Sequence, residues 1–263
     1  MNSLAHTPLT FNILGIEISA YGIMIGIGIT AGIFVAIWLG KKRGIQSDDI
    51  FTLALYAIPL AIVGARIYYV IFSDHIYTFV EIFQIWNGGI AILGAVIGGA
   101  IGVALYCLIH KKNFFKIADI SAPALIIGQA IGRIGCYLNG CCYGIETTDP
   151  ALQWFPISTQ LDGVWHLSTF FYESFWCFLG FALLLFLFKK LHRTGALIFS
   201  YFVIYGVGRC IIETWRGDSL YLAGIKISQL LSGILVIVGI IGLVFIYTNV
   251  KKRKAKNEKN INP

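Results

Sequence analysis

Seven stretches of apolar residues, each about 20 long, constrain this chain more than any other feature of its sequence. They cover residues 20–39, 50–72, 89–109, 118–138, 172–188, 196–213 and 227–248. A helix crosses a bilayer core of about 30 Å with roughly 20 residues at a rise of about 1.5 Å each. The stretches lack the strict alternation of membrane barrel strands, so we predict an all-α, polytopic integral membrane protein with seven transmembrane helices.

The composition excludes the soluble alternatives. Apolar residues make up 57% of the chain and charged residues only 13%, with a mean hydropathy of +0.79. Such a chain has too few charges for a water-exposed surface and too many apolar residues for disorder. Its 29 glycines follow no three-residue period, and its 6 cysteines are too thinly spread for a small disulfide scaffold. A membrane protein remains.

Basic residues indicate the direction of the chain across the membrane. Fifteen of the 20 Lys and Arg lie in alternate loops and at the end, at 41–43, 111–116, 189–193 and 251–259. Because basic loops stay in the cytoplasm, we expect the N-terminus outside and the C-terminus inside. We expect one membrane domain over 1–250, with a small extracytoplasmic cap at about 139–171, and a basic cytoplasmic tail over 251–263. This tail is expected to contact anionic membrane lipids, not nucleic acid.

Three arginines lie inside predicted spans, where each costs at least about 2.5–3.5 kcal/mol. Arg66, Arg133 and Arg209 are each roughly 20–24 Å from the cytoplasmic end of their helix by helical rise, in the outer half of the bilayer. Glu213 follows Arg209 by one turn. We predict a cationic site that binds the phosphodiester of a phospholipid. The alternative is plain helix anchoring, with Arg209 paired to Glu213 and Arg66 reaching the headgroups.

Other polar residues fall at the same predicted level. Tyr21 opens the first span, and Asn139 and Glu173 flank the cap. A single Tyr at this depth also suits the aromatic belt of a membrane protein. At the opposite end of the fourth span, Asp119 is expected to cap the helix.

Glycines are dense around the start of the third span. Gly94 and Gly98 have the spacing of small residues that let two helices pack closely. Gly88 and Gly89 stand before the periodic run, where flexible backbone can bring N–H groups close to a ligand.

The run from Gly132 to Gly144, GRIGCYLNGCCYG, resembles the signature GRxGNFxNGExxG of the prolipoprotein diacylglyceryl transferase family of bacterial inner-membrane enzymes. Further matches follow in family order over roughly residues 20 to 216. They are AYG at 20–22, GARIYY at 64–69, the glycine pair at 88–89, YE at 172–173, and YGVGR at 205–209 with Glu213. The family also has seven spans and an outside N-terminus.

The resemblance implies an enzyme that transfers diacylglyceryl from phosphatidylglycerol to the lipobox cysteine thiol of a prolipoprotein signal peptide. The products are a thioether and glycerol phosphate, and no cofactor or metal is expected. Arg133 and Arg209 would bind the phosphate, Glu213 would orient Arg209, and Tyr21 would line the site. The expected substrate-binding residues are Arg66, Gly88, Gly89, Arg133, Asn139, Gly144 and Glu173.

Three departures from the family pattern bear on the expected chemistry. Cys136 stands in place of Asn, Cys141 in place of Glu, and Leu93 in place of the usual His or Tyr, so a general base proposed at that last position is missing. His166 and His75 are the imidazoles expected on the outer side, although ordinary surface positions explain both. Two alternatives remain open: a divergent homologue that uses the same lipid on another acceptor, and a non-catalytic phospholipid-binding membrane protein.

Three cysteines gather at the outer end of the fourth span. Cys136 with Cys141 or Cys142 would suit a disulfide in an oxidising exterior. A soft-metal site is not favoured, because C-x4-C-C is no standard ligand spacing and has no obvious fourth partner. A thiol that carries the diacylglyceryl group is a further, less favoured alternative. The other cysteines, Cys107, Cys177 and Cys210, are expected to be packing residues.

Overall fold

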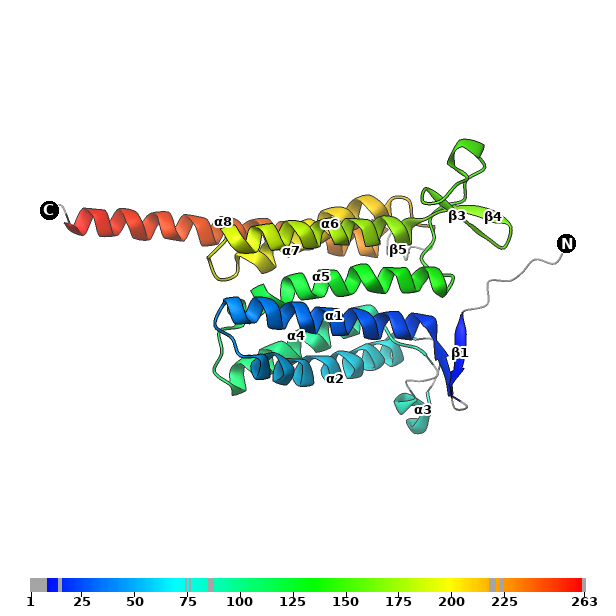
Figure 1. Cartoon of the computed structure of the whole chain (residues 1–263), viewed down its shortest axis with the longest axis horizontal. Helices are drawn as coiled ribbons and strands as arrows, with labels where there is room; N and C mark the ends of the chain where they lie inside the picture. Colours follow the sequence, from blue (N-terminus) through cyan, green and yellow to red (C-terminus); the bar gives the residue numbers. More distant parts are fainter. Residues whose placement is uncertain are drawn as a thin grey trace. The chain divides into compact units, whose positions relative to one another are not determined.

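The computed structural model describes residues 9–13, 16–73, 75, 77–84, 88–217, 221–222 and 225–261 (Figure 1). Its long helices are α1 Ala20–Lys42, α2 Ser47–Phe72, α4 Ile92–Ile109, α5 Phe114–Leu138, α6 Thr169–Lys190, α7 Ala196–Glu213 and α8 Ile227–Ile261. Each is long and apolar enough to cross a membrane, α8 through Ile227–Thr248. The predicted all-α, seven-span architecture is confirmed, whereas the direction of the chain across the membrane stays a prediction.

The other elements among the described residues are short. They are helix α3 Phe79–Phe83, the 3₁₀ turn Pro150–Leu152, and three antiparallel hairpins: β1 Thr10–Ile13 with β2 Ile16–Ser19, β3 Ser158–Leu161 with β4 Val164–Leu167, and β5 Tyr221–Leu222 with β6 Ile225–Lys226. The second hairpin and the 3₁₀ turn fall within the predicted cap. In that hairpin Ser158 pairs with Leu167 and Leu161 with Val164.

The predicted start of the fourth span is wrong. Helix α5 begins at Phe114, and Asp119 lies buried within it instead of capping its start. Asn113 takes this role: its Oδ1 accepts a hydrogen bond from the backbone N–H of Lys116 at 3.1 Å. The helix therefore begins before the predicted apolar stretch, because a side-chain cap stabilises its first turn whether or not that turn lies in lipid.

The chain forms two compact units, residues 36–120 and residues 1–35 with 121–263. The expected division into one membrane domain, a cap and a tail stays a prediction. In the smaller unit, α2 and α4 pack backbone to backbone. A Cβ on Gly94 would lie 2.2 Å from the carbonyl oxygen of Gly64, and one on Gly98 would lie 2.1 Å from that of Leu60. The predicted close packing through small residues is confirmed.

Helices of the larger unit also pack closely at glycines. A Cβ on Gly28 of α1 would lie 2.9 Å from the carbonyl oxygen of Gly128 in α5, and one on Gly206 of α7 would lie 2.8 Å from that of Ser232 in α8. Packing through glycine lets polar side chains on neighbouring helices reach one another without an intervening apolar layer. Within this unit the C-terminal ends of α5 and α7 and the N-terminal end of α6 lie at the end that also carries the β3–β4 hairpin (Figure 1).

Candidate functional site

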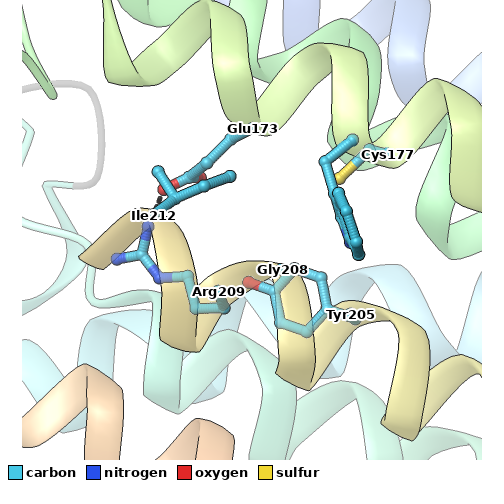
Figure 2. A pocket seen from close by; sticks show the side chains of 7 residues that line it. Glu173, Cys177, Tyr205, Gly208, Arg209 and Ile212 are labelled. Carbon is cyan, nitrogen blue, oxygen red and sulfur yellow. Dashed lines mark hydrogen bonds and ion pairs between the residues drawn. The ribbon is translucent and has the colours of Figure 1, made fainter. Parts of the chain in front are cut away.

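A pocket lies between α6 and α7. It is lined by Glu173, Trp176, Cys177, Tyr205, Gly208, Arg209 and Ile212, and Figure 2 shows Arg209 directed toward Glu173 across it. Its volume is about 10 Å³, room for about one water molecule. The absence of a side chain at Gly208 leaves room for the ring of Trp176, because a Cβ on Gly208 would lie 2.1 Å from the indole nitrogen. A phosphate group is larger than this space, so its binding requires side chains to move.

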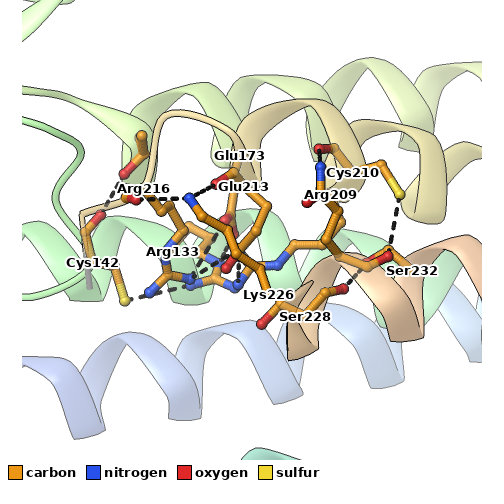
Figure 3. Close-up of polar contacts among 12 residues, drawn as sticks. Arg133, Cys142, Glu173, Arg209, Cys210, Glu213, Arg216, Lys226, Ser228 and Ser232 are labelled. Carbon is orange, nitrogen blue, oxygen red and sulfur yellow. Dashed lines mark hydrogen bonds and ion pairs between the residues drawn. The ribbon is translucent and has the colours of Figure 1, made fainter. Parts of the chain in front are cut away.

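Glu173 joins two arginines from different helices. Its Oε2 lies 2.5 Å from Nε of Arg133 in α5, and its Oε1 contacts Nη1 of Arg209 in α7. The Glu173 residue is only 5% exposed. Burial in a low-dielectric surrounding strengthens both ion pairs and makes the removal of either partner costly. Arg133 and Arg209, two of the three arginines predicted to form one cationic site, therefore converge with a carboxylate between them (Figure 3).

A second carboxylate and two further cations complete the group. Nη2 of Arg209 lies 2.9 Å from Oε2 of Glu213, the pairing expected one turn along the helix. Arg216 lies 3.9 Å from Glu173 and 4.0 Å from Glu213. Nζ of Lys226 donates to the backbone oxygens of Glu213 at 2.7 Å and Arg216 at 3.0 Å.

These six residues, which we call the cationic cluster, carry an excess of positive charge. The cluster consists of Arg133, Glu173, Arg209, Glu213, Arg216 and Lys226. Four cations stand against two carboxylates, a surplus of two positive charges. Because charge at the end of membrane helices is expensive to bury, this surplus favours an anion of about two charges at the site. A phosphate matches the planar donor geometry of arginine.

The loop after α5 is fastened to the segment after α7. The backbone N–H of Gly144 donates to Leu167 at 2.8 Å, and Gly144 forms a β-bridge with Arg216. A Cβ on Gly144 would lie 2.7 Å from that of Leu167 and 2.8 Å from the carbonyl oxygen of Trp215, so only glycine fits without displacement. His166, considered above as a base, has its Nδ1 3.2 Å from the carbonyl oxygen of Gly144. The loop therefore helps to hold Arg216 in the cluster.

Three thiols of this loop lie beside Arg133. The Sγ atoms of Cys136, Cys141 and Cys142 are all within 4.8 Å of one another, and all three cysteines are free thiols. Nη1 of Arg133 points to Sγ of Cys142 at 3.6 Å (Figure 3). Hydrogen bonds from the thiols of Cys136 and Cys141, together with the nearby positive charge of Arg133, lower the pKa of the Cys142 thiol. Tyr21 packs against this group.

Arg66 belongs to the smaller unit, where backbone oxygens surround its buried guanidinium. Nε donates to Ile82 at 3.0 Å, Nη2 to Glu81 at 2.6 Å, and Nη1 to Gly88 at 2.7 Å and Gly89 at 2.8 Å. Gly88 and Gly89 have φ of +82° and +72°, which glycine adopts without strain. Arg66 thus clamps the loop before α4 through carbonyl groups. Its role in lipid binding, like that of both glycines, stays a prediction.

Several contributions to the site were not expected from the sequence. Glu173 was predicted only as a substrate-binding residue, yet it bridges Arg133 and Arg209. Neither Arg216 nor Lys226 was among the predicted site residues. One signal was available for Arg216, which follows Glu213 by three residues, a separation that brings side chains of a helical turn together. Asn139 lies beside the thiols, with its Nδ2 3.8 Å from Sγ of Cys141, and its expected role in substrate binding stays a prediction.

Comparison with known proteins gives one consistent result. Residues 8–245 match the family described as prolipoprotein diacylglyceryl transferase. The chain is 38% identical over 254 residues to the phosphatidylglycerol–prolipoprotein diacylglyceryl transferase of Clostridium botulinum strain Langeland, covering 94% of this chain and 98% of that protein. Proteins of the same name from Listeria innocua and Streptococcus agalactiae are 39% and 41% identical, covering 93% and 90% of this chain and 90% and 95% of their own. With its seven apolar helices, the chain is a multi-pass membrane protein that belongs to the prolipoprotein diacylglyceryl transferase family.

Proposed function

We propose that this protein transfers the diacylglyceryl group of phosphatidylglycerol to the lipobox cysteine thiol of prolipoprotein signal peptides. The relatives compared above carry that activity in their names. The observation that carries the proposal is the cationic cluster, whose surplus of two positive charges suits a phosphodiester that becomes a phosphate monoester.

The reaction exchanges one bond for another. The acceptor sulfur forms a bond to the terminal glyceryl carbon while the bond from that carbon to the phosphate oxygen breaks. The electron pair leaves on the phosphate, so its charge rises from about one to about two as glycerol phosphate departs, and the thiol proton passes to the surroundings. Guanidiniums that hold the phosphate more tightly as this charge develops lower the barrier.

The glutamates position the cations in this scheme. Arg209 reaches Glu173 with one terminal nitrogen and Glu213 with the other, so its plane is fixed before a lipid arrives. A phosphate that enters between Arg133 and Arg209 takes over part of the contact with Glu173, because that carboxylate lies between the two guanidiniums. Donors that are already oriented do not have to reorganise as charge develops on the phosphate, and this preorganisation is how such sites lower the barrier.

The remaining predicted residues and the location complete the proposal. Tyr21 packs against the cluster that contains Cys136, and Asn139 contacts Cys141. Gly144, in the same loop as Cys141, forms a β-bridge with Arg216. We place the protein in the bacterial cytoplasmic membrane with the cationic cluster at its extracytoplasmic face. Signal peptides of exported proteins and phosphatidylglycerol both reach that face.

Purified protein supplied with phosphatidylglycerol and a peptide containing one lipobox cysteine tests the proposal. We expect the peptide to gain the mass of diacylglyceryl and glycerol phosphate to appear in equal amount. A peptide with Ser in place of Cys, and phosphatidylcholine in place of phosphatidylglycerol, are the controls. Lipid binding without either product would support the non-catalytic alternative and overturn the proposed activity.

A variant pair connects the activity to the site. Arg133→Gln should reduce turnover by roughly 10²- to 10³-fold, the usual cost of one preorganised charge-stabilising donor. Arg193→Gln is the matched control, because Arg193 lies in the same unit but contacts Ile246 and the ring of Tyr247. Equal activity of the two variants would remove the cationic cluster from the mechanism.

A further inference from the structure

The three thiols of Cys136, Cys141 and Cys142 form a compact ligand set. Their Sγ atoms lie within 4.8 Å of one another. Three sulfurs bound to one ion at about 2.3 Å lie about 3.8 Å apart in tetrahedral geometry. Small rotations of the side chains therefore suffice to bring all three onto one metal ion.

The three sulfurs come from the end of α5 and from the loop that follows it. Cys136 lies in the last turn of α5, and the backbone N–H of Cys141 donates to the carbonyl oxygen of Cys136 at 3.0 Å. Cys142 has φ of +63°, a left-handed conformation that costs a non-glycine residue stability. The hydroxyl of Thr169 holds the same residue by donating to its carbonyl oxygen at 2.7 Å. The loop thus keeps a strained residue in place and its thiol near the other two.

Each sulfur also faces an N–H donor. Nη1 of Arg133 points to Cys142 at 3.6 Å and to Cys136 at 4.0 Å, and Nδ2 of Asn139 points to Cys141 at 3.8 Å. Sulfur accepts such bonds best as a thiolate, and metal-bound thiolates are commonly supported by outer donors of this kind. A divalent ion with three thiolates carries one net negative charge, which the adjoining surplus of positive charge stabilises.

We propose that Cys136, Cys141 and Cys142 bind a thiophilic divalent cation of the Zn²⁺ class, whose open fourth position takes the sulfur of the acceptor cysteine. Catalytic zinc sites have three protein ligands and one open position, and a thiol bound to such an ion loses its proton. The second part of the inference rests on the proposed function.

This arrangement supplies what the cationic cluster lacks. The acceptor thiol must lose a proton, yet the carboxylates there, Glu173 and Glu213, are engaged in ion pairs with arginines. On binding the metal, the thiol releases its proton to water and becomes the fourth ligand. Its lone pair then forms the bond to the glyceryl carbon as the carbon–oxygen bond to phosphate breaks. The metal keeps its oxidation state, and the product, a neutral thioether, is a weak ligand that dissociates.

Geometry favours the same reading. Arg133 contacts Glu173 through Nε and points Nη1 at Cys142, so one guanidinium connects the proposed phosphate site to the thiols. An acceptor sulfur on the metal would therefore lie beside the phosphate. Holding two reactants next to each other removes much of the entropic barrier to their reaction.

Metal binding is tested on the full-length protein in detergent, with Co²⁺ as a coloured probe for Zn²⁺. We expect about one Co²⁺ per chain with a thiolate-to-metal charge-transfer band. Cys141→Ser and Cys142→Ser should each weaken Co²⁺ affinity by at least about 100-fold, the upper range for loss of an outer supporting group. Cys107→Ser, at a buried thiol of the smaller unit, should leave the affinity unchanged. Failure of fully reduced wild-type protein to bind Co²⁺ or Zn²⁺ through thiolates would overturn the proposal without reference to any variant.

The fourth position has its own readout. A lipobox peptide with Cys should change the charge-transfer band of the Co²⁺ protein, and the Ser peptide should not. An unchanged band with the Cys peptide would overturn the role of the metal in acceptor binding. Equal rates of transfer in metal-free and Zn²⁺-loaded protein would do the same while leaving the proposed function intact. Conversely, a band change without any diacylglyceryl product would count against the proposed function and leave the metal site standing.

Discussion

Replacing Arg209 by Lys and by Gln separates the charge of this side chain from its two-pronged geometry. One terminal nitrogen contacts Glu173, and the other lies 2.9 Å from Glu213, so the guanidinium holds two carboxylates on two helices. A lysine ammonium is a compact point charge on a different stem, and we expect it to hold only one of them well. A glutamine brings no charge.

The expected magnitudes follow from these contacts. Loss of one charge-assisted hydrogen bond costs about 1.5–3 kcal/mol, so Arg209→Lys should reduce kcat/KM by roughly 10- to 150-fold if the contact orients the cation for the transition state. Arg209→Gln removes the cation shared by two buried carboxylates and leaves Arg133 and Arg216 as the arginines near them. Breaking a buried ion pair in this way costs up to about 3–5 kcal/mol in stability. A similar loss in the transition state corresponds to roughly 10²- to 10⁴-fold in kcat/KM.

The assay is transfer of diacylglyceryl to a labelled lipobox peptide in micelles of fixed phosphatidylglycerol content. Thermal unfolding of each variant shows whether it is folded at the assay temperature, and Arg193→Gln reports the effect of losing a cation elsewhere in the same unit. The expected order of activity is wild type and Arg193→Gln, then Arg209→Lys, then Arg209→Gln. If Arg209→Lys were as active as wild type, the two-pronged contact would have no part in catalysis.

Three substitutions test local contacts, two in the smaller unit and one in the larger unit. Gly98→Ala should destabilise the protein by about 1–3 kcal/mol, because its Cβ would lie 2.1 Å from a carbonyl oxygen, whereas Gly99→Ala, with its nearest neighbour at 3.6 Å, should be nearly neutral in thermal unfolding. Gly208→Ala should push Trp176 away from α7 and lower both the melting temperature and transfer activity, while Gly233→Ala, with open space around it, should leave activity unchanged and melting unchanged or slightly higher. Arg66→Lys should increase proteolysis of the loop before α4, because one ammonium cannot satisfy four carbonyl oxygens; an unaltered digestion pattern would contradict the clamp.

Most of the membrane architecture could be predicted from the sequence. Lipid requires about 20 apolar residues per helix, and that requirement leaves few alternatives for the seven stretches. The helix ends were harder, because local hydrogen bonds decide them. Asn113 begins α5 through a side-chain cap, and α6 begins at Thr169, before the apolar stretch predicted from residue 172.

The candidate site could be predicted only in part. The expense of arginine in lipid pointed to Arg133 and Arg209, but the bridge through Glu173 depends on helix rotation, which apolar patterning along α6 does not define. The guanidinium of Arg66 donates to backbone carbonyl oxygens, and the direction of a carbonyl group depends on the backbone conformation, which residue types alone do not predict. The cysteines are the clearest case. Their spacing argued against a metal site, whereas the left-handed backbone of Cys142 and the turn at Cys141 place three sulfurs together.

Retention of phosphatidylglycerol, measured by native mass spectrometry of the purified protein, tests most directly whether the cationic cluster binds a lipid phosphate. Wild type and Arg193→Gln should each retain about one molecule, released by added glycerol phosphate. A folded variant with both Arg133→Gln and Arg209→Gln should retain none. If that variant kept its phosphatidylglycerol as firmly as wild type, the lipid phosphate would be bound elsewhere and the cationic cluster would not be its binding site.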